Sequence, residues 1–396
     1  MSTQNDSPPR PAKAAIWNDP KYRSLFFQAV LLALVVWGGM TIFNNTTANM
    51  ERQGIASGFG FMNTTAGFGI ITSLIEYTEA SSYGRAFLVG LLNTLMLSAL
   101  GVVAATILGV IIGVARLSKN WLVRKLASVY IETFRNIPLL LQIFFWYFAV
   151  LRALPSPKNS VNWADSFFLN NRGLYSPAPV PEPGLNIVLW SVFIAIIATI
   201  FMARWAKKRQ EATGQQFHTV YASIGLIVGL PLLASMLTGF PLSWTQPELK
   251  GFNFVGGMVI IPEFIAMWVS LSIYTASFIA EVVRAGIQSV SHGQTEAAMA
   301  LGLKPNHSLR LVILPQALRV IIPPLTNQYL NLTKNSSLAA AIAYPELVSV
   351  FTGTVLNQTG QAVEIIAITM AVYLTISLTI SAFMNWYNAK MALVER

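Results

Sequence analysis

Few side chains in this chain could carry out catalysis. Its 396 residues include no cysteine and three histidines, His218, His292 and His307, which do not form an H-E-x-x-H or similar metal-binding spacing. The apolar segments contain no histidine and no acidic pair, and the sequence has no G-x-x-x-x-G-K-[ST] phosphate loop. We therefore expect no catalytic site, no metal site and no cofactor bound by this chain.

One polar cluster stands out because it lies inside an apolar run, 320–343. It consists of Thr333, Lys334, Asn335, Ser336 and Ser337. A charge inside a membrane span is costly, and such a residue is usually paired or faces a cavity. Two interpretations are open. Either the cluster lines a translocation pathway beside an interrupted helix, or Lys334 binds carbonyl groups that the helix break releases.

A second group of residues lies in a polar segment, 281–319. Its members are a glutamate, two alanines, a glycine and a Leu-Pro pair, namely Glu296, Ala297, Ala298, Gly302, Leu314 and Pro315. Thr295 is predicted to cap the start of a short helix, and Gly302 suits a C-terminal cap with positive φ. A second helix, about 308–313, is expected to end at the Leu-Pro pair. The segment is either a small docking helix or a solvated connector.

Membrane-spanning helices must position these groups. Hydrophobic residues make up 54% of the chain and charged residues 11%, and the mean hydropathy is +0.55, whereas soluble domains carry about 25% charged residues. Because roughly 20 helical residues cross a bilayer, the apolar runs predict an all-α integral membrane protein with about eight transmembrane helices. The predicted spans are 25–43, 86–115, 137–151, 185–203, 224–239, 264–280, 320–343 and 365–386.

Basic residues predict the orientation of these spans. With a cytoplasmic N-terminus, 19 of the 26 lysines and arginines fall in inside segments and six in outside segments, as the positive-inside rule requires. Both termini are therefore expected in the cytoplasm. This topology also accounts for the net charge of +10, so we expect a lipid bilayer around the chain and no nucleic-acid partner. Arg135 and Glu281 fall at cytoplasmic span ends, either as gate or interface residues or as membrane-edge anchors.

The polar loop resembles a known motif. Residues 296–298, Gly302 and 314–315 match the E-A-A-x3-G-x9-I-x-L-P pattern of the EAA loop in permease subunits of bacterial ABC importers, with Val312 in place of the isoleucine. Four further strings are similar to the amino-acid branch of that family, at 90–95, 132–147, 281–288 and 332–339. A chain of this length resembles one subunit of the general L-amino-acid importers.

The resemblance implies a type I importer fold with five shared spans. It implies that a dimer of ABC ATPase subunits, which binds ATP and Mg²⁺, docks on the EAA loop. It also implies three further partners: a second permease subunit of different sequence, a periplasmic amino-acid-binding protein, and a polar L-amino acid that crosses the bacterial inner membrane. Glu296, its two neighbouring alanines, Gly302 and the Leu-Pro pair would form the ATPase-coupling site.

The chain then divides into six regions. They are a cytoplasmic polar tail (1–24), an extra span (25–43), a periplasmic linker (44–85), the first part of the permease core (86–151), an insertion with periplasmic loops and two extra spans (152–262), and the second part of the core (263–396). The proline-rich stretch 155–184 is expected to be extended. The alternative function is a secondary transporter or channel that works without an ATPase. It predicts acidic residues within the spans, whereas Glu281 and Glu364 lie at span edges.

Overall fold

Long apolar helices make up most of the structure. The computed structural model describes residues 20–52 and 57–391, so most of the predicted tail 1–24 lies outside the described residues. Among the described residues, seven helices are long and apolar enough to cross a membrane, and one bent pair adds an eighth. The prediction of a helical membrane fold with about eight spans is confirmed. The seven are α1 (Pro20–Arg52), α2 (Tyr83–Arg116), α5 (Leu185–Thr213), α6 (Thr219–Leu237), α7 (Pro262–Gln288), α10 (Leu314–Asn335) with its helical extensions, and α12 (Ala362–Met391).

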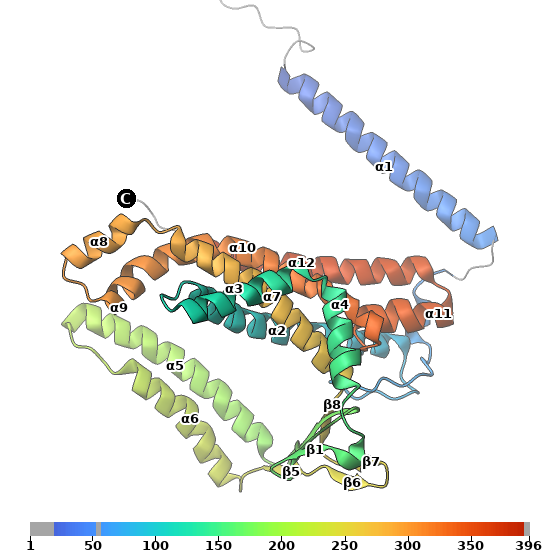
Figure 1. Cartoon of the computed structure of the whole chain (residues 1–396). Coiled ribbons are helices and arrows are strands. Elements are labelled where there is room, and N and C mark those ends of the chain that lie inside the picture. Colours follow the sequence, from blue (N-terminus) through green and yellow to red (C-terminus); the bar gives the residue numbers. More distant parts are fainter. Residues whose placement is uncertain (1–19, 53–56, 392–396) are drawn as a thin grey trace, which may run out of the picture.

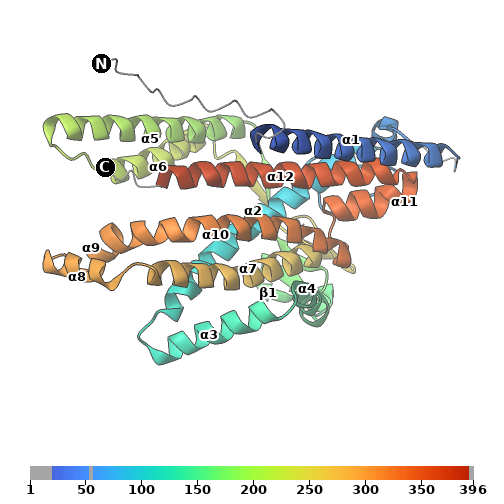
Figure 2. The same ribbon diagram turned by 90° about the horizontal axis from the view of Figure 1, so that it is seen from above.

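The bent pair corrects the third predicted span. Helix α3 (Trp121–Asn136) lies beside α7 (Figure 2). Helix α4 (Leu139–Phe144) continues as a π-helical segment to Leu151, and the chain bends by 105° between α3 and α4. The run 137–151 alone is therefore not a straight span. Pro138 causes the bend, because it has no N–H and disfavours helical backbone at the residue before it. The side-chain amide of Gln142 donates to the carbonyl oxygens of Phe134 and Ile137, which the break leaves free.

The helix that contains α10 is longer than the sequence predicts. It begins with α9 (Pro305–Ser308), passes through a π-helical segment, and continues through α10 into a 3₁₀ segment that ends at Ile342. The sequence led us to expect an interrupted helix here, but Pro323 and Pro324 both lie inside α10 and do not break it. Membrane helices tolerate proline where neighbouring groups satisfy the freed carbonyls. The helix ends where Ala343 takes a φ of 58°, and a second π-helical segment with α11 (Leu356–Thr359) then leads into α12.

Small residues bring the central helices into close contact. Helix α2 packs against α7, and a Cβ atom built on Gly109 would lie 2.6 Å from the Cβ of Ile279. A Cβ on Gly113 would lie 2.7 Å from the carbonyl oxygen of Ala280. A glycine spaced four residues from another allows the backbones of membrane helices to approach in this way. The α2–α7 pair is therefore the rigid centre of the bundle.

Eight short strands interrupt the insertion between α4 and α7, where the sequence predicted loops. One antiparallel sheet has the order β1-β2-β3-β8, and β4–β5 and β6–β7 form two-stranded ribbons. The strands are β1 (Val161–Trp163), β2 (Phe167–Asn170), β3 (Gly173–Ser176), β4 (Ala178–Pro181), β5 (Leu242–Thr245), β6 (Glu248–Lys250), β7 (Asn253–Val255) and β8 (Met258–Ile260). The expectation of extended backbone in 155–184 holds for β1–β4. Strand β4 accommodates Pro179 and Pro181 because it pairs with β5 alone, which leaves one edge free.

The strands and the polar loop lie at opposite ends of α7. Strand β8 leads directly into the start of α7, and the short helix α8 (His292–Ala300) follows its end. Figure 1 shows α8 beyond the ends of α7, α10 and α12 and about level with one end of α5, while β1–β8 gather near the opposite ends of α5 and α6. Helices α5 and α6 pack mainly against each other, and α6 contains no buried residue.

Candidate functional site

The short helix of the polar loop begins earlier than predicted. Its first residue is His292, and Ser291 holds the extended backbone of an N-cap position, with φ −61° and ψ 144°. Thr295 therefore lies inside α8, and its predicted role as the N-cap is wrong. Ser291 and Gln294 have the serine-x-x-glutamine spacing of a capping box, and the backbone N–H of Gln294 donates to the carbonyl oxygen of Ser291 at 3.1 Å. This signal in the sequence could have placed the helix start correctly.

The end of α8 follows the prediction for Gly302. The φ of Gly302 is +76°, a left-handed backbone conformation that residues other than glycine adopt only at a cost in free energy. The N–H of Leu303 donates to the carbonyl oxygen of Ala298 at 3.1 Å, and the N–H of Gly302 donates to that of Met299 at 2.9 Å. These bonds close the helix and reverse the chain toward α9. The glycine thus produces a compact helix–turn–helix.

The two alanines of α8 have different surroundings. Ala298 is buried, and α8 contacts the π-helical segment that precedes α10, whereas Ala297 is exposed. Glu296 is also exposed, and its carboxylate lies 3.4 Å from Nδ1 of His292. Met299 and Leu301 present large apolar side chains to the outside, with Leu301 82% exposed. The outer face of α8 therefore combines one carboxylate with exposed apolar side chains.

The Leu-Pro pair does not end a helix, which corrects a second prediction about this loop. Leu314 and Pro315 form the first turn of α10, and the preceding residues Leu309–Ile313 are π-helical. A proline clashes with the carbonyl four residues earlier in an α-helix, and a π-helical turn widens the helix at that point. The chain consequently runs as one helical unit from Pro305 to Ile342. This unit begins just after the turn that follows α8.

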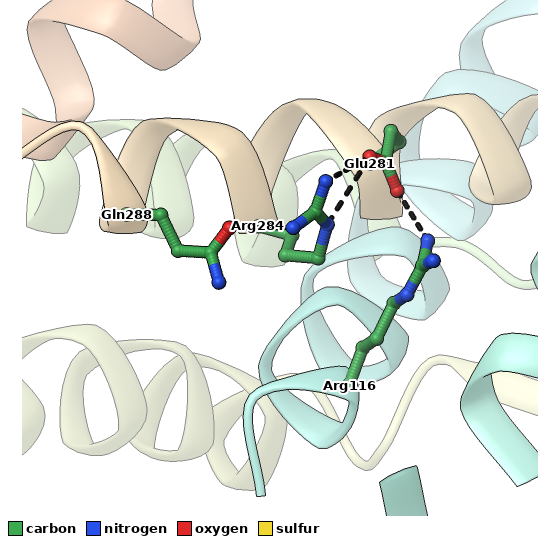
Figure 3. Close-up of polar contacts among 4 residues, drawn as sticks. All are labelled: Arg116, Glu281, Arg284 and Gln288. Carbon is green, nitrogen blue, oxygen red and sulfur yellow. Dashed lines mark hydrogen bonds and ion pairs between the residues drawn. The ribbon is translucent and has the colours of Figure 1, made fainter. Parts of the chain in front are cut away.

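Glu281 joins two helices at the end of the bundle next to α8 (Figure 3). Its carboxylate forms ion pairs with Arg116, the last residue of α2, and with Arg284, one turn further along α7. The guanidinium of Arg284 also donates to the side-chain carbonyl of Gln288, the last residue of α7. The three charged side chains are 23–28% exposed. The network ties α2 to α7 about two turns before the end of α7, so Glu281 holds two helices together and is more than a simple membrane-edge anchor.

The polar cluster around Lys334 does not converge on one cavity. Lys334 and Ser337 line a cavity of about 440 Å³ together with Tyr373. Asn335 lines a different cavity, and Ser336 is buried, where its hydroxyl donates to the carbonyl oxygen of Thr333. Among the described residues, no carbonyl oxygen lies within hydrogen-bond distance of Nζ of Lys334. The structure thus gives no contact for the interpretation in which Lys334 binds freed carbonyls.

Helix α10 has a polar face of which the sequence analysis identified Asn335 but not Gln328 or Asn331. Gln328, Asn331 and Asn335 line a cavity of about 270 Å³ between α10 and α7, opposite Tyr274 and Thr275. The three amides recur at intervals of three and four residues in a span that is otherwise largely apolar, and this spacing places them on one face of a helix. That periodicity was the available signal. The cavity lies at mid-length of α7, between two membrane-spanning helices.

Glu346, between α10 and α12, is completely buried. Its carboxylate accepts hydrogen bonds from the backbone N–H groups of Val348 and Ser349 at 2.8 and 2.7 Å, and from the hydroxyl of Tyr373 at 3.1 Å. The two backbone bonds cap the start of a π-helical segment. Because both carboxylate oxygens are engaged in this way, the buried acid has a structural role.

These features define a class of protein. Membrane-spanning helices surround polar side chains that are suited to a solute, and a short helix projects beyond one end of the bundle, as in a transport subunit moved by a partner. Comparison with known families matches residues 195–393 to the binding-protein-dependent transport system inner membrane component.

Two long relatives match almost the whole chain. The general L-amino acid transport system permease protein AapQ of Rhizobium johnstonii is 56% identical over 378 residues, which cover 96% of this chain and 94% of that protein. The glutamate/glutamine/aspartate/asparagine transport system permease protein BztB of Rhodobacter capsulatus is 45% identical over 410 residues, which cover 96% of each chain. The chain belongs to this family and is the permease subunit of an amino-acid ABC importer, not itself an enzyme. The resemblance found from the sequence is confirmed.

A solved structure described as an amino acid ABC transporter with histidines also aligns with this chain. The TM-score is 0.47 at 22% identity, and the alignment covers 78% of this chain and 95% of that chain.

Proposed function

We propose that α8 is the docking helix for a dimer of ABC ATPase subunits, which bind the ATP and Mg²⁺ that drive transport. The observation that carries this proposal is the projecting position of α8 together with its exposed outer face. Glu296 offers a carboxylate to a basic group of the partner, and Met299 and Leu301 offer apolar contacts. The continuous helix from Pro305 to Ile342 supplies a rigid connection from the docking site into the membrane.

The remaining partners follow from the same assignment. A second permease subunit, of different sequence, completes the pathway, and a periplasmic amino-acid-binding protein delivers the substrate, a polar L-amino acid. The excess of lysine and arginine in the inside segments supports cytoplasmic positions for both termini and for α8 in the bacterial inner membrane. In this orientation β1–β8 face the periplasm.

The translocation pathway is assigned to polar side chains between the spans. Asn335 belongs to it with Gln328 and Asn331, because all three line the cavity between α10 and α7. Lys334 and Ser337 line a second cavity on the other side of α10, and the buried Ser336 stabilises the helix between them. An amide can donate and accept hydrogen bonds, so it suits the polar groups of an amino acid.

Cross-linking from a single cysteine tests the docking proposal directly, because the natural chain contains no cysteine. We expect Met299→Cys, modified with a maleimide-benzophenone reagent in native membranes, to cross-link to a protein that carries a phosphate-binding loop. Trp163→Cys on β1 is the matched control, since it is 75% exposed but lies at the other end of α7. We expect no such cross-link from the control.

A deletion of α8 provides the functional test. Replacing residues 292–300 with a glycine–serine linker should abolish ATP-dependent uptake while the protein still reaches the membrane. Persistence of ATP-dependent uptake in the deletion variant would overturn the docking assignment. Uptake by the lone chain in liposomes without ATP would instead support the secondary transporter or channel.

A further inference from the structure

Helix α5 is longer than a bilayer requires. It has 29 residues and is about 43 Å long at 1.5 Å per residue, whereas the hydrocarbon core of a bilayer is about 30 Å thick. Residues 185–203 are uncharged, and the helix then continues through 204–213, which contain four basic side chains and one acidic side chain. In Figure 1 this end of α5 lies about level with α8. The uncharged part is long enough to cross the hydrocarbon, so the charged part begins at the level of the lipid headgroups.

One face of α5 points away from the rest of the chain. Helix α5 packs mainly against α6, and its buried residues Ser191, Ala195 and Ala206 mark the inner face. On the opposite face, large exposed apolar side chains recur at steps of three and four residues, a spacing that places them in one stripe along the helix. The members of this apolar stripe are Leu189, Phe193, Ile197 and Ile200.

The apolar stripe continues directly into basic side chains. Arg204 follows Ile200 by four residues, and Lys207 and Lys208 follow Arg204 by three and four residues, so all three lie on the same face. Each of the three is exposed. The acidic residue of this segment is Glu211, whose carboxylate lies 4.0 Å from Nζ of Lys207. Because both of these side chains are mainly exposed, the pair offsets little of the positive charge.

Trp205 supports the placement of this segment at a membrane surface. Its side chain is exposed, and the guanidinium carbon of Arg209 lies 5.4 Å from the centroid of its ring. Tryptophan is enriched where a membrane meets water, and long basic side chains at helix ends extend toward the headgroups. The sequence of the neighbouring α6 contains no charged residue. The positive charge of the two packed helices is therefore concentrated on one end of α5.

We propose that this face of α5 binds an anionic phospholipid, with the lipid phosphate at Arg204, Lys207 and Lys208 and an acyl chain along the apolar stripe. Basic side chains at the end of a membrane helix attract anionic headgroups, and salt weakens this attraction. A phospholipid carries a charged part and an apolar part in the same order as this face, which favours it over a soluble protein. The inference goes beyond the transport function, and it requires neither the docking role of α8 nor a particular orientation of the chain.

Quenching by brominated lipids tests the proposal at the site itself. Bimane is attached to Phe201→Cys, whose natural side chain is 65% exposed one turn before Arg204. The complex purified through this chain is placed in vesicles of equal parts phosphatidylglycerol and phosphatidylcholine, one of them brominated on its acyl chains. The complex with the natural chain is the blank, since this chain has no cysteine. We expect the quenching to show phosphatidylglycerol enriched about threefold to tenfold over its bulk share.

A second labelling position is the control for the probe. Leu233 is 61% exposed on α6, toward the other end of the helix pair and away from the basic residues. Bimane on Leu233→Cys should be quenched equally by the two brominated lipids. Raising the salt from about 0.05 M to about 0.5 M should weaken the preference at Phe201→Cys, because the Debye length shortens.

Combined substitutions assign the preference to the basic side chains. Arg204→Gln, Lys207→Gln and Lys208→Gln together should remove it, while Arg204→Lys, Lys207→Arg and Lys208→Arg together should retain it. The matched control variant removes the same number of charges in the strand region and should keep the preference. Its substitutions to glutamine are at Lys158, Arg172 and Lys250.

Four results would overturn the proposal. Two of them are equal quenching by both lipids at Phe201→Cys and a preference that survives the combined glutamine substitutions. The third is the absence of quenching by either lipid, which would show that another protein segment covers this face. The fourth is loss of the ATPase subunit from the glutamine variant with the lipid preference unchanged, which would make the basic end of α5 a subunit contact.

Discussion

At the scale of single residues, the most connected charge is Glu281. One carboxylate faces two guanidinium groups, those of Arg116 and Arg284, which come from different helices. Ion pairs that keep contact with solvent contribute little individually, but a shared carboxylate also separates two like charges. Removing it therefore affects both arginines. The network is better suited to holding the ends of α2 and α7 in register than to stabilising the whole fold.

A double-mutant cycle on Arg116 and Glu281 measures this link. We expect Arg116→Gln and Glu281→Gln to show a coupling of about 0.5–1 kcal/mol in the free energy of unfolding, measured by SDS titration in mixed micelles. The pair Lys207 and Glu211 is the control, because its atoms are 4.0 Å apart and both side chains are mainly exposed. Its coupling should be near zero. Equal coupling in the two pairs would contradict a special role for Glu281.

The backbone of Gly302 leads to a second prediction at the residue scale. At a φ of +76° an added Cβ is strained, so Gly302→Ala should destabilise the turn after α8 by about 1 kcal/mol. Hydrogen exchange is the measurement. The amide of Leu303, bonded to the carbonyl oxygen of Ala298, should exchange several-fold faster.

Gly293 provides the control for this substitution. It lies within α8 and lacks a positive φ, so Gly293→Ala should slow exchange in the helix, since alanine favours helical backbone. Faster exchange in both variants would mean that the loop responds to any added methyl group, and the positive φ of Gly302 would not explain the result.

At the scale of elements, the α2–α7 contact depends on two glycines. We expect Gly113→Val to lower the free energy of unfolding by about 1–3 kcal/mol, because the new side chain would overlap the backbone of α7 at Ala280 and force the helices apart. The same substitution at Gly225 on α6 is the matched control. No atom lies within 4 Å of a Cβ built there, so Gly225→Val should have little effect. A comparable loss at both positions would rule out the packing explanation.

The elements also show how far the sequence alone could lead. Charge-free runs of about 20 residues identify most spans, because burial in lipid requires them to be apolar over their whole length. The sequence predicted the end of α8 correctly, because the positive φ at Gly302 is a requirement of the local backbone. The bend at Pro138 and the path of α3 did not, since α3 carries charged residues and meets α7 through side chains far apart in the sequence. Likewise, β1–β8 are three or four residues long, too short for alternation to be visible.

In the candidate site too, the sequence identified some residues and missed others. Glu296, Gly302 and the surrounding loop have a fixed local spacing, so the sequence identified them. The α10 amides meet Tyr274 and Thr275 only through the packing of α10 against α7. Lys334 and Asn335 are adjacent in the sequence but face different cavities, because neighbouring residues of a helix point about 100° apart.

At the scale of the whole molecule, the docking proposal assigns different functions to the two ends of α7. If α8 binds the ATPase in the cytoplasm, the strands that precede α7 lie in the periplasm. Three spans, α1, α5 and α6, present large apolar side chains outward along most of their length. Such faces suit lipid or another membrane helix. The chain thus combines a tightly packed α2–α7 centre with peripheral helices that adjust to their surroundings.

Labelling of single cysteines in intact spheroplasts tests this orientation. A membrane-impermeant maleimide should react with Trp163→Cys without permeabilisation, because the 75% exposed side chain would face the periplasm. Leu301→Cys, 82% exposed at the other end of α7, should react only after the membrane is opened. The unmodified chain is the blank, since it has no cysteine of its own. The reverse pattern would place α8 in the periplasm, where no ATP-hydrolysing subunit could reach it, and both the topology and the coupling role would be lost together.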